Sequence, residues 1–83
     1  MSMIHVVYNG KTEDFEFDTV FSREKLPGLG ITVDNITPQQ VTHDQIKLAM
    51  AQQFDVGVNE FNDFFIEINS NGNITVRPQT TFG

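Results

Sequence analysis

The side chains able to do acid–base chemistry are few and scattered in this 83-residue sequence. His5 and His43 are its two histidines, and it has no cysteine. His5 falls in a predicted strand opposite Asp14 or Glu16, which is typical of a surface cross-strand pair. His43 falls in the first turn of a predicted helix, where a solvated imidazole is the commoner case. No serine has the strand–turn–helix context of an activated nucleophile. The sequence therefore predicts no catalytic residue, no metal site and no cofactor.

Acidic side chains gather near the start of the chain, at Glu13, Asp14, Glu16 and Asp18. The simplest interpretation is a solvated strand face that also discourages pairing between sheet edges. The functional interpretation is an acidic face that binds a basic protein partner, or that imitates nucleic-acid phosphates on a host enzyme. Asp14, Glu16 and Asp18 are the candidate residues for that face.

Charge and hydropathy exclude several classes of protein. The formal net charge is −6, and the five basic residues are spread along the chain. Nucleic acids and anionic membrane surfaces need clustered Lys and Arg, so the sequence predicts neither as a partner. No apolar run approaches the ~18 residues of a membrane span, and no signal-peptide core is present. We therefore expect a soluble, cytoplasmic protein with one domain over residues 1–83, of which 79–83 form a flexible tail.

One long helix is predicted over residues 42–54. Thr42 and Gln45 have the spacing of a capping box, in which each side chain accepts a hydrogen bond from the other's backbone N–H. The interior holds good helix formers, and Gly57 is the predicted stop because glycine readily adopts a left-handed conformation.

Helical periodicity divides this segment into two faces. At about 100° per residue, one face carries Ile46, Ala49, Met50 and Phe54, and is predicted to pack on a sheet. Leu48 points away from that face, so either a loop or another molecule covers it. Leu48 is thus the first apolar candidate for an interaction site.

A β-hairpin is predicted before the helix. Asn9-Gly10 is a strong signal for a type I′ turn, and residues 13–21 alternate between apolar and polar types, which predicts a half-buried strand. A two-residue turn places Ile4 opposite Phe15 and His5 opposite Asp14. A turn two residues longer shifts these pairs but keeps the faces. The predicted inward set is Ile4, Val6, Phe15 and Phe17.

The connector, residues 22–41, has weaker signals. Residues 26–30 are rich in turn formers, residues 31–33 are predicted as a short strand, and residues 37–40 repeat a capping-box pattern. Long unstructured connectors are uncommon in compact domains, so we expect this segment to pack or to be the functional loop.

A second hairpin is predicted over residues 64–77. A three-residue loop with a left-handed Gly72 places Ile68 opposite Ile74 and Ile66 opposite Val76, which keeps the isoleucines on one face. Pro78 cannot donate to a ladder, so the strand ends there or lies at an edge. Three phenylalanines, Phe61, Phe65 and Phe82, do not fit the inward sets, and Phe65 is the second apolar interaction candidate.

These elements give a β-β-α-β-β order and an α+β fold, with a four-stranded sheet crossed by one helix. The order, the Asn9-Gly10 hairpin, the helix from Thr42 and the Phe82-Gly83 terminus resemble the ubiquitin-like β-grasp superfamily, which includes sulfur-carrier proteins of the MoaD and ThiS type. Activated members end in Gly-Gly, whereas this chain has Phe82 at the penultimate position. The resemblance implies a β-grasp-like fold.

The function that we expect is a small non-enzymatic protein-interaction domain of ubiquitin-like type, with a protein partner. One alternative is a carrier or modifier activated at its C-terminal Gly83. Another is a small acidic inhibitor of the kind that mobile elements encode. The sequence leaves homo-oligomers open.

Overall fold

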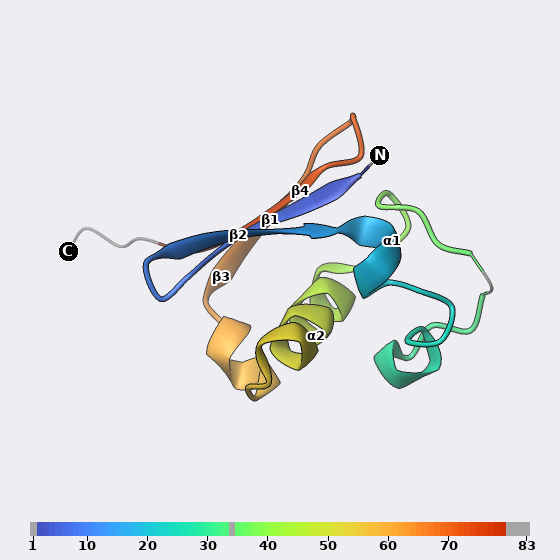
Figure 1. The fold of residues 1–83 in the computed structure, drawn as a ribbon, viewed down its shortest axis with the longest axis horizontal. Helices are drawn as coiled ribbons and strands as arrows, with labels where there is room; N and C mark the ends of the chain where they lie inside the picture. Colours follow the sequence, from blue (N-terminus) through green and yellow to red (C-terminus); the bar gives the residue numbers. More distant parts are fainter. Residues whose placement is uncertain (1, 34, 80–83) are drawn as a thin grey trace.

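The computed structural model describes residues 2–33 and 35–79, and it contains one mixed sheet with helical segments on one side (Figure 1). In chain order the elements are β1 (Met3–Tyr8), β2 (Lys11–Glu16), α1 (Phe17–Val20), the 3-10 turn η1 (Pro27–Leu29), α2 (His43–Phe54), the 3-10 turn η2 (Val58–Phe61), β3 (Phe64–Ile68) and β4 (Ile74–Pro78).

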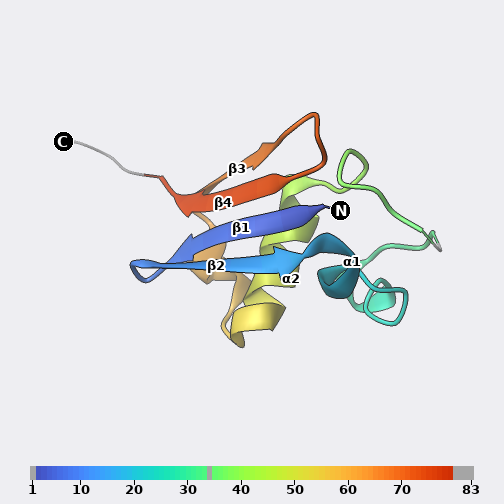
Figure 2. The same ribbon diagram turned by 45° about the horizontal axis from the view of Figure 1, so that its top comes forward.

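The four strands lie in the order β2-β1-β4-β3, as Figure 2 shows. Both hairpins are antiparallel, and they join through β1 and β4, which run in parallel side by side at the centre of the sheet. The predicted α+β fold, a four-stranded sheet crossed by one main helix, is therefore confirmed. The edges of the sheet are β2 and β3.

The first hairpin has the register that a two-residue turn predicts. Ile4 pairs with Phe15 and His5 with Asp14. Asn9 and Gly10 have φ values of 53° and 77°, as a type I′ turn requires at both central positions. The turn therefore sets which side chains of β1 and β2 share a face.

The second hairpin also has its predicted register. Ile68 pairs with Ile74 and Ile66 with Val76, and Gly72 is left-handed with φ of 92°. The strand ends at Pro78, which has no N–H to extend the ladder.

Helix α2 begins with the predicted capping box. The Gln45 N–H donates to Thr42 Oγ1 at 3.1 Å, and the Thr42 N–H donates to Gln45 Oε1 at 2.9 Å. The predicted stop at Gly57 is wrong. Asp55 adopts the left-handed conformation instead, with φ of 55°, and its N–H donates back to the last turn, while Gly57 has an ordinary φ of −71°. A short polar side chain such as Asp tolerates this conformation.

The strand predicted over residues 13–21 is wrong in its second half, because β2 ends at Glu16 and the chain turns into α1. Phe17, Val20 and Phe21 are all buried, and their spacing of three and four residues is that of a helical face. Apolar residues at 15, 17 and 21 fit alternation equally well in the sequence. In an alternating strand Thr19 would face inward and Val20 outward. The structure shows Val20 buried and Thr19 exposed, which fits a helix and not a strand.

The connector packs against the core, as expected. Leu26, Leu29, Ile31 and Val41 are buried along it. The strand predicted over residues 31–33 is wrong, since these residues join no sheet. Residues 37–40 form a single turn, in which the Gln40 N–H donates to the Thr37 carbonyl and the Thr37 N–H donates to Gln40 Oε1, one of the two bonds of the predicted capping-box pattern.

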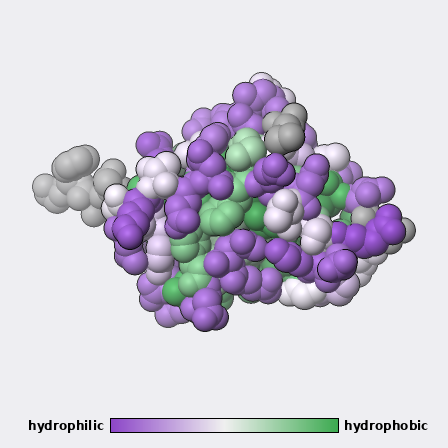
Figure 3. Space-filling view, viewed as in Figure 1, coloured by the Kyte–Doolittle hydropathy of each residue, from purple (hydrophilic) through white to green (hydrophobic). Residues whose placement is uncertain are grey.

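The core lies between α2 and the covered face of the sheet. Ile46, Ala49 and Met50 are buried there, together with Ile4 and Val6. Hydrophobic surface is visible between the sheet and α2 in Figure 3, with hydrophilic residues around it.

The structure assigns a place to Phe61 and Leu48, which the sequence left outside the inward sets, and tests the inward prediction for Phe15. Phe61 of η2 is fully buried and belongs to the core. Leu48 is half-buried and packs against the core cluster, so packing explains it. Phe15, predicted inward, is also half-buried at its margin.

Candidate functional site: the open face of the sheet

In the part of the chain that the structure describes, one face of the sheet has no helix against it. Figure 1 places α1 and α2 on the same side, and the strands bury Ile4, Val6, Ile66, Ile74 and Val76 toward them. Because successive side chains of a strand point to opposite faces, the alternate residues form the other surface, here called the open face. It comprises Met3, His5, Val7, Thr12, Asp14, Glu16, Phe65, Glu67, Thr75 and Arg77.

One row of the open face has a carboxylate at each end. The strand registers align Asp14, His5, Thr75 and Glu67 across all four strands. The His5 Nδ1 lies 2.7 Å from Asp14 Oδ1, with both side chains about half exposed, at 42% and 55%. The predicted cross-strand pair is therefore present. An exposed pair of this kind contributes little to stability. Because Asp14 and Glu67 are the two ends of the row, it carries a carboxylate side chain at each margin of the sheet.

A second row carries the aromatic and cationic groups. Phe65 of β3 pairs with Arg77 of β4, and the Arg77 guanidinium lies 5.3 Å from the centre of the Phe65 ring. Continuing the parallel register places Val7 beside Arg77 and Thr12 beyond it. Phe65 is 46% exposed, which makes it a large apolar side chain presented to solvent. Beside it is a small hollow of about 220 Å³, which reaches Pro78 and Gln79.

The fold brings together only some of the predicted interaction residues. Asp14, Glu16 and Phe65 share the open face. Asp18 is exposed in α1, beyond the end of β2, and Leu48 packs against the core on the covered side. Gly83, the predicted activation site, lies outside the described residues.

Sequence reasoning missed Val7, Glu67 and Arg77 as members of this face. The signal was present in part, because alternation in the second hairpin already placed Glu67 and Arg77 opposite the inward isoleucines. What the sequence lacked was the parallel pairing of β1 with β4, which joins the two hairpins into one surface.

An aromatic cluster closes one end of the core. It consists of Tyr8, Phe15, Phe54, Phe61 and Phe64, with ring centres of neighbouring pairs 4.6 to 6.1 Å apart. The Tyr8 hydroxyl donates to Glu60 Oε1 at 3.3 Å. Burial raises the pKa of Tyr8 above its ordinary value, and the Glu60 charge and hydrogen bond raise it further. The phenol is therefore a neutral donor at physiological pH.

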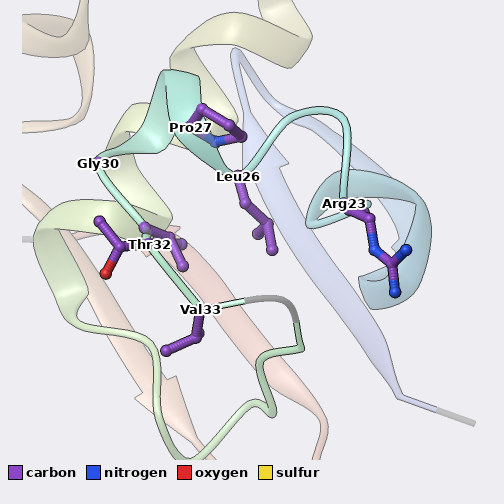
Figure 4. Close-up of a pocket in the computed structure, with 7 residues that line it drawn as sticks. Arg23, Leu26, Pro27, Gly30, Thr32 and Val33 are labelled. Carbon is purple, nitrogen blue, oxygen red and sulfur yellow. The ribbon is translucent and has the colours of Figure 1, made fainter.

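A second hollow, with a volume of about 460 Å³, lies in the connector. Leu26, Ile31 and Val33 give it an apolar lining, and Arg23 is its one charged lining residue (Figure 4). The Arg23 side chain extends away from Leu26 and Val33 in this view. The described residues that line the hollow therefore include no acid and base groups that face each other.

Residues 2–33 and 35–79 contain no cluster of three or more metal-ligating His, Asp or Glu side chains. Among the helices described for this chain, none has the length and apolar character needed to cross a membrane. Comparison with protein-family models, with curated proteins and with solved structures found no match for the chain.

Proposed function

We propose that this chain is a non-enzymatic protein-interaction domain and that the open face binds its partner. The observation that carries the proposal is the exposed Phe65 ring beside Arg77, on a sheet face that no described element covers. Aromatic residues and arginine are both enriched at protein interfaces relative to the rest of the surface.

The chemistry of the face favours a basic partner. Carboxylates of Asp14 and Glu16 mark the β2 margin and Glu67 marks the β3 margin, while the whole chain carries a net charge of −6. A partner with an apolar side chain for Phe65 and Val7, and with Lys or Arg toward Asp14 and Glu16, complements both features. Such charge complementarity acts chiefly on association rate and specificity.

We also propose that the domain is of the ubiquitin-like β-grasp type. The β-β-α-β-β order of the main elements, and a sheet in which the first and last strands are parallel neighbours, support this assignment. The carrier alternative depends on Gly83, which has no described environment, so the open face is the better supported site.

Capture of the partner from the native cell tests the proposal. The tagged 83-residue chain with a photo-crosslinking residue at Thr75, at the centre of the open face, should trap a specific protein. Phe65→Ser should abolish the crosslink, because it removes the exposed ring. Val58→Ser is the matched control: Val58 is 44% exposed but lies in η2, away from the open face. The control should leave the crosslink unchanged.

The acidic margin is tested separately. Asp14→Asn with Glu16→Gln should weaken capture, and added salt should weaken capture by the wild type, because salt screens exposed charges. The assignment of the open face would be overturned if Val58→Ser reduced the crosslink as much as Phe65→Ser does. It would also be overturned if Phe65→Ser left the crosslink at the wild-type level.

A further inference from the structure

The two edges of the sheet differ in how they are protected against pairing with another strand. Natural proteins protect exposed edges with charged side chains, proline or bulges. Edge strand β2 (Lys11–Glu16) has four charged residues among its six. Edge strand β3 (Phe64–Ile68) reads Phe-Phe-Ile-Glu-Ile, and it has one charge and no proline or glycine. The β3 edge thus lacks the protection that the β2 edge has.

Hydrogen bonds flanking β3 identify which of its backbone groups are free. The Gln79 N–H donates to the Asp63 carbonyl, and the Asn69 N–H donates to the Asn73 carbonyl. In an antiparallel ladder the bonded pairs alternate, so Phe65 and Glu67 also bond to β4. The N–H and C=O groups of the intervening Phe64, Ile66 and Ile68 therefore point away from the sheet.

Within residues 2–33 and 35–79, no hydrogen bond is made to these outward groups of Phe64, Ile66 and Ile68. Strand β3 lies at the outer margin of the sheet in Figure 2. The side chains of Phe64 and Ile68 are half-buried there, so an added strand would cover apolar surface as well as backbone.

We propose that the β3 edge pairs antiparallel with β3 of a second copy of this chain, forming one continuous eight-stranded sheet. The sequence of the edge is self-complementary in one register. With the two-fold axis at Ile66, that residue stands opposite Ile66 of the second copy and Phe64 opposite Ile68. All three outward-facing residues then form bonded pairs, which uses every free donor and acceptor of the edge. A shift of two residues loses one of these pairs.

The same register gives favourable side-chain neighbours on the covered face and sets no like charges opposite each other on the open face. On the covered face it adds Ile–Ile and Phe–Ile cross-strand pairs, and on the open face it places Phe65 opposite Glu67 of the second copy. A closed two-fold dimer uses the same patch on both subunits and leaves no further edge of this kind exposed. One edge strand gives a small interface, so the dimer is weak and forms at high protein concentration. This inference is independent of the partner proposed for the open face.

Amide exchange tests which edge pairs. As protein concentration is raised at physiological ionic strength, the amides of Phe64, Ile66 and Ile68 should gain protection. The amides of Thr12, Asp14 and Glu16 point outward at the β2 edge by the same alternation, and they serve as the internal control. They should exchange at a constant rate. Protection at both edges, or at neither, would overturn the proposal.

Charge reversal tests the register, with sedimentation as the measurement of the monomer–dimer equilibrium. Phe65→Glu places like charges opposite each other twice and should weaken dimerisation roughly tenfold. Phe65→Lys instead faces Glu67 of the second copy and should dimerise at least as well as the wild type. Phe65→Glu with Glu67→Lys should restore dimerisation. These side chains are exposed, so the fold is retained.

Three results would contradict the proposal. A wild type that stays monomeric at every concentration would show that the edges do not pair. Equal loss of dimer with Phe65→Lys and Phe65→Glu would show that the ring itself makes the contact through the open face. Failure of the double variant to recover would exclude this register.

Discussion

The hydroxyl of Tyr8 donates a hydrogen bond to Glu60 Oε1 at 3.3 Å, which links the end of β1 to η2 across 52 residues of chain. Burial and the Glu60 carboxylate both raise the pKa of Tyr8 above 10.0. A group with a raised pKa in the folded state binds its proton more tightly there than in the unfolded chain. Its stabilising contribution is complete below pH 10 and is lost as pH rises through the folded pKa.

We therefore expect stability to fall above pH 10 more steeply in the wild type than in Tyr8→Phe, which keeps the ring but cannot ionise. Urea unfolding at a series of alkaline pH values measures this difference. Tyr8 is the sole tyrosine, so phenolate absorbance reports its pKa directly. Glu60→Gln should lower that pKa, because the carboxylate is one of its causes. Parallel pH profiles for wild type and Tyr8→Phe would contradict this account.

Phe61 and Phe65 are four residues apart but differ completely in burial, at 0% and 46% exposed. Phe61→Ala should destabilise the domain by about 3–5 kcal/mol, since it leaves a cavity in the aromatic cluster. Phe65→Ala should cost at most about 1 kcal/mol, the order of an exposed cation–π contact. Urea midpoints of both variants measure the contrast. Similar losses would show that Phe65 is part of the core.

The features predicted correctly from sequence are those with short-range causes. The Asn9-Gly10 turn, the Gly72 loop and the Thr42–Gln45 capping box each depend on residues within a few positions of one another, and each fixes an adjacent register or helix start. The faces of both hairpins follow from these turns, so the sequence predicts Asp14 and Glu16 on a solvated face and leaves Phe65 outside the inward set.

The features that were missed depend on contacts between distant segments. Phe15, Phe17 and Phe21 fit a strand pattern, and burial of Val20 against the core decides for α1. Phe61 joins the core because η2 brings it to Tyr8, with which it stacks at 5.2 Å. The open face likewise depends on β1 pairing with β4, which no local pattern of residues specifies.

The capping box of α2 should make a measurable contribution to stability. Thr42→Ala removes the hydroxyl that accepts from the Gln45 N–H and should cost about 1 kcal/mol. Thr42→Ser keeps an accepting oxygen and should remain within a few tenths of a kcal/mol of the wild type. Chemical unfolding gives both values. If serine and alanine were equally destabilising, the lost methyl group rather than the cap would be responsible.

Two glycines with open space around them should respond to alanine in opposite directions. Apart from the adjacent residues in the chain, no described heavy atom lies within 4 Å of a Cβ added at Gly10 or Gly28, so neither substitution produces a steric clash. Gly10 has φ of 77°, and Gly10→Ala should destabilise the first hairpin by about 1–2 kcal/mol through backbone strain. The φ of Gly28 in η1 lies outside the left-handed region. Gly28→Ala should therefore stabilise the domain by about 0.4–1 kcal/mol, because alanine restricts the conformations of the unfolded chain. Unfolding midpoints of the two variants against the wild type measure the signs, and a stabilising Gly10→Ala would exclude the type I′ turn that sets the register of β1 and β2.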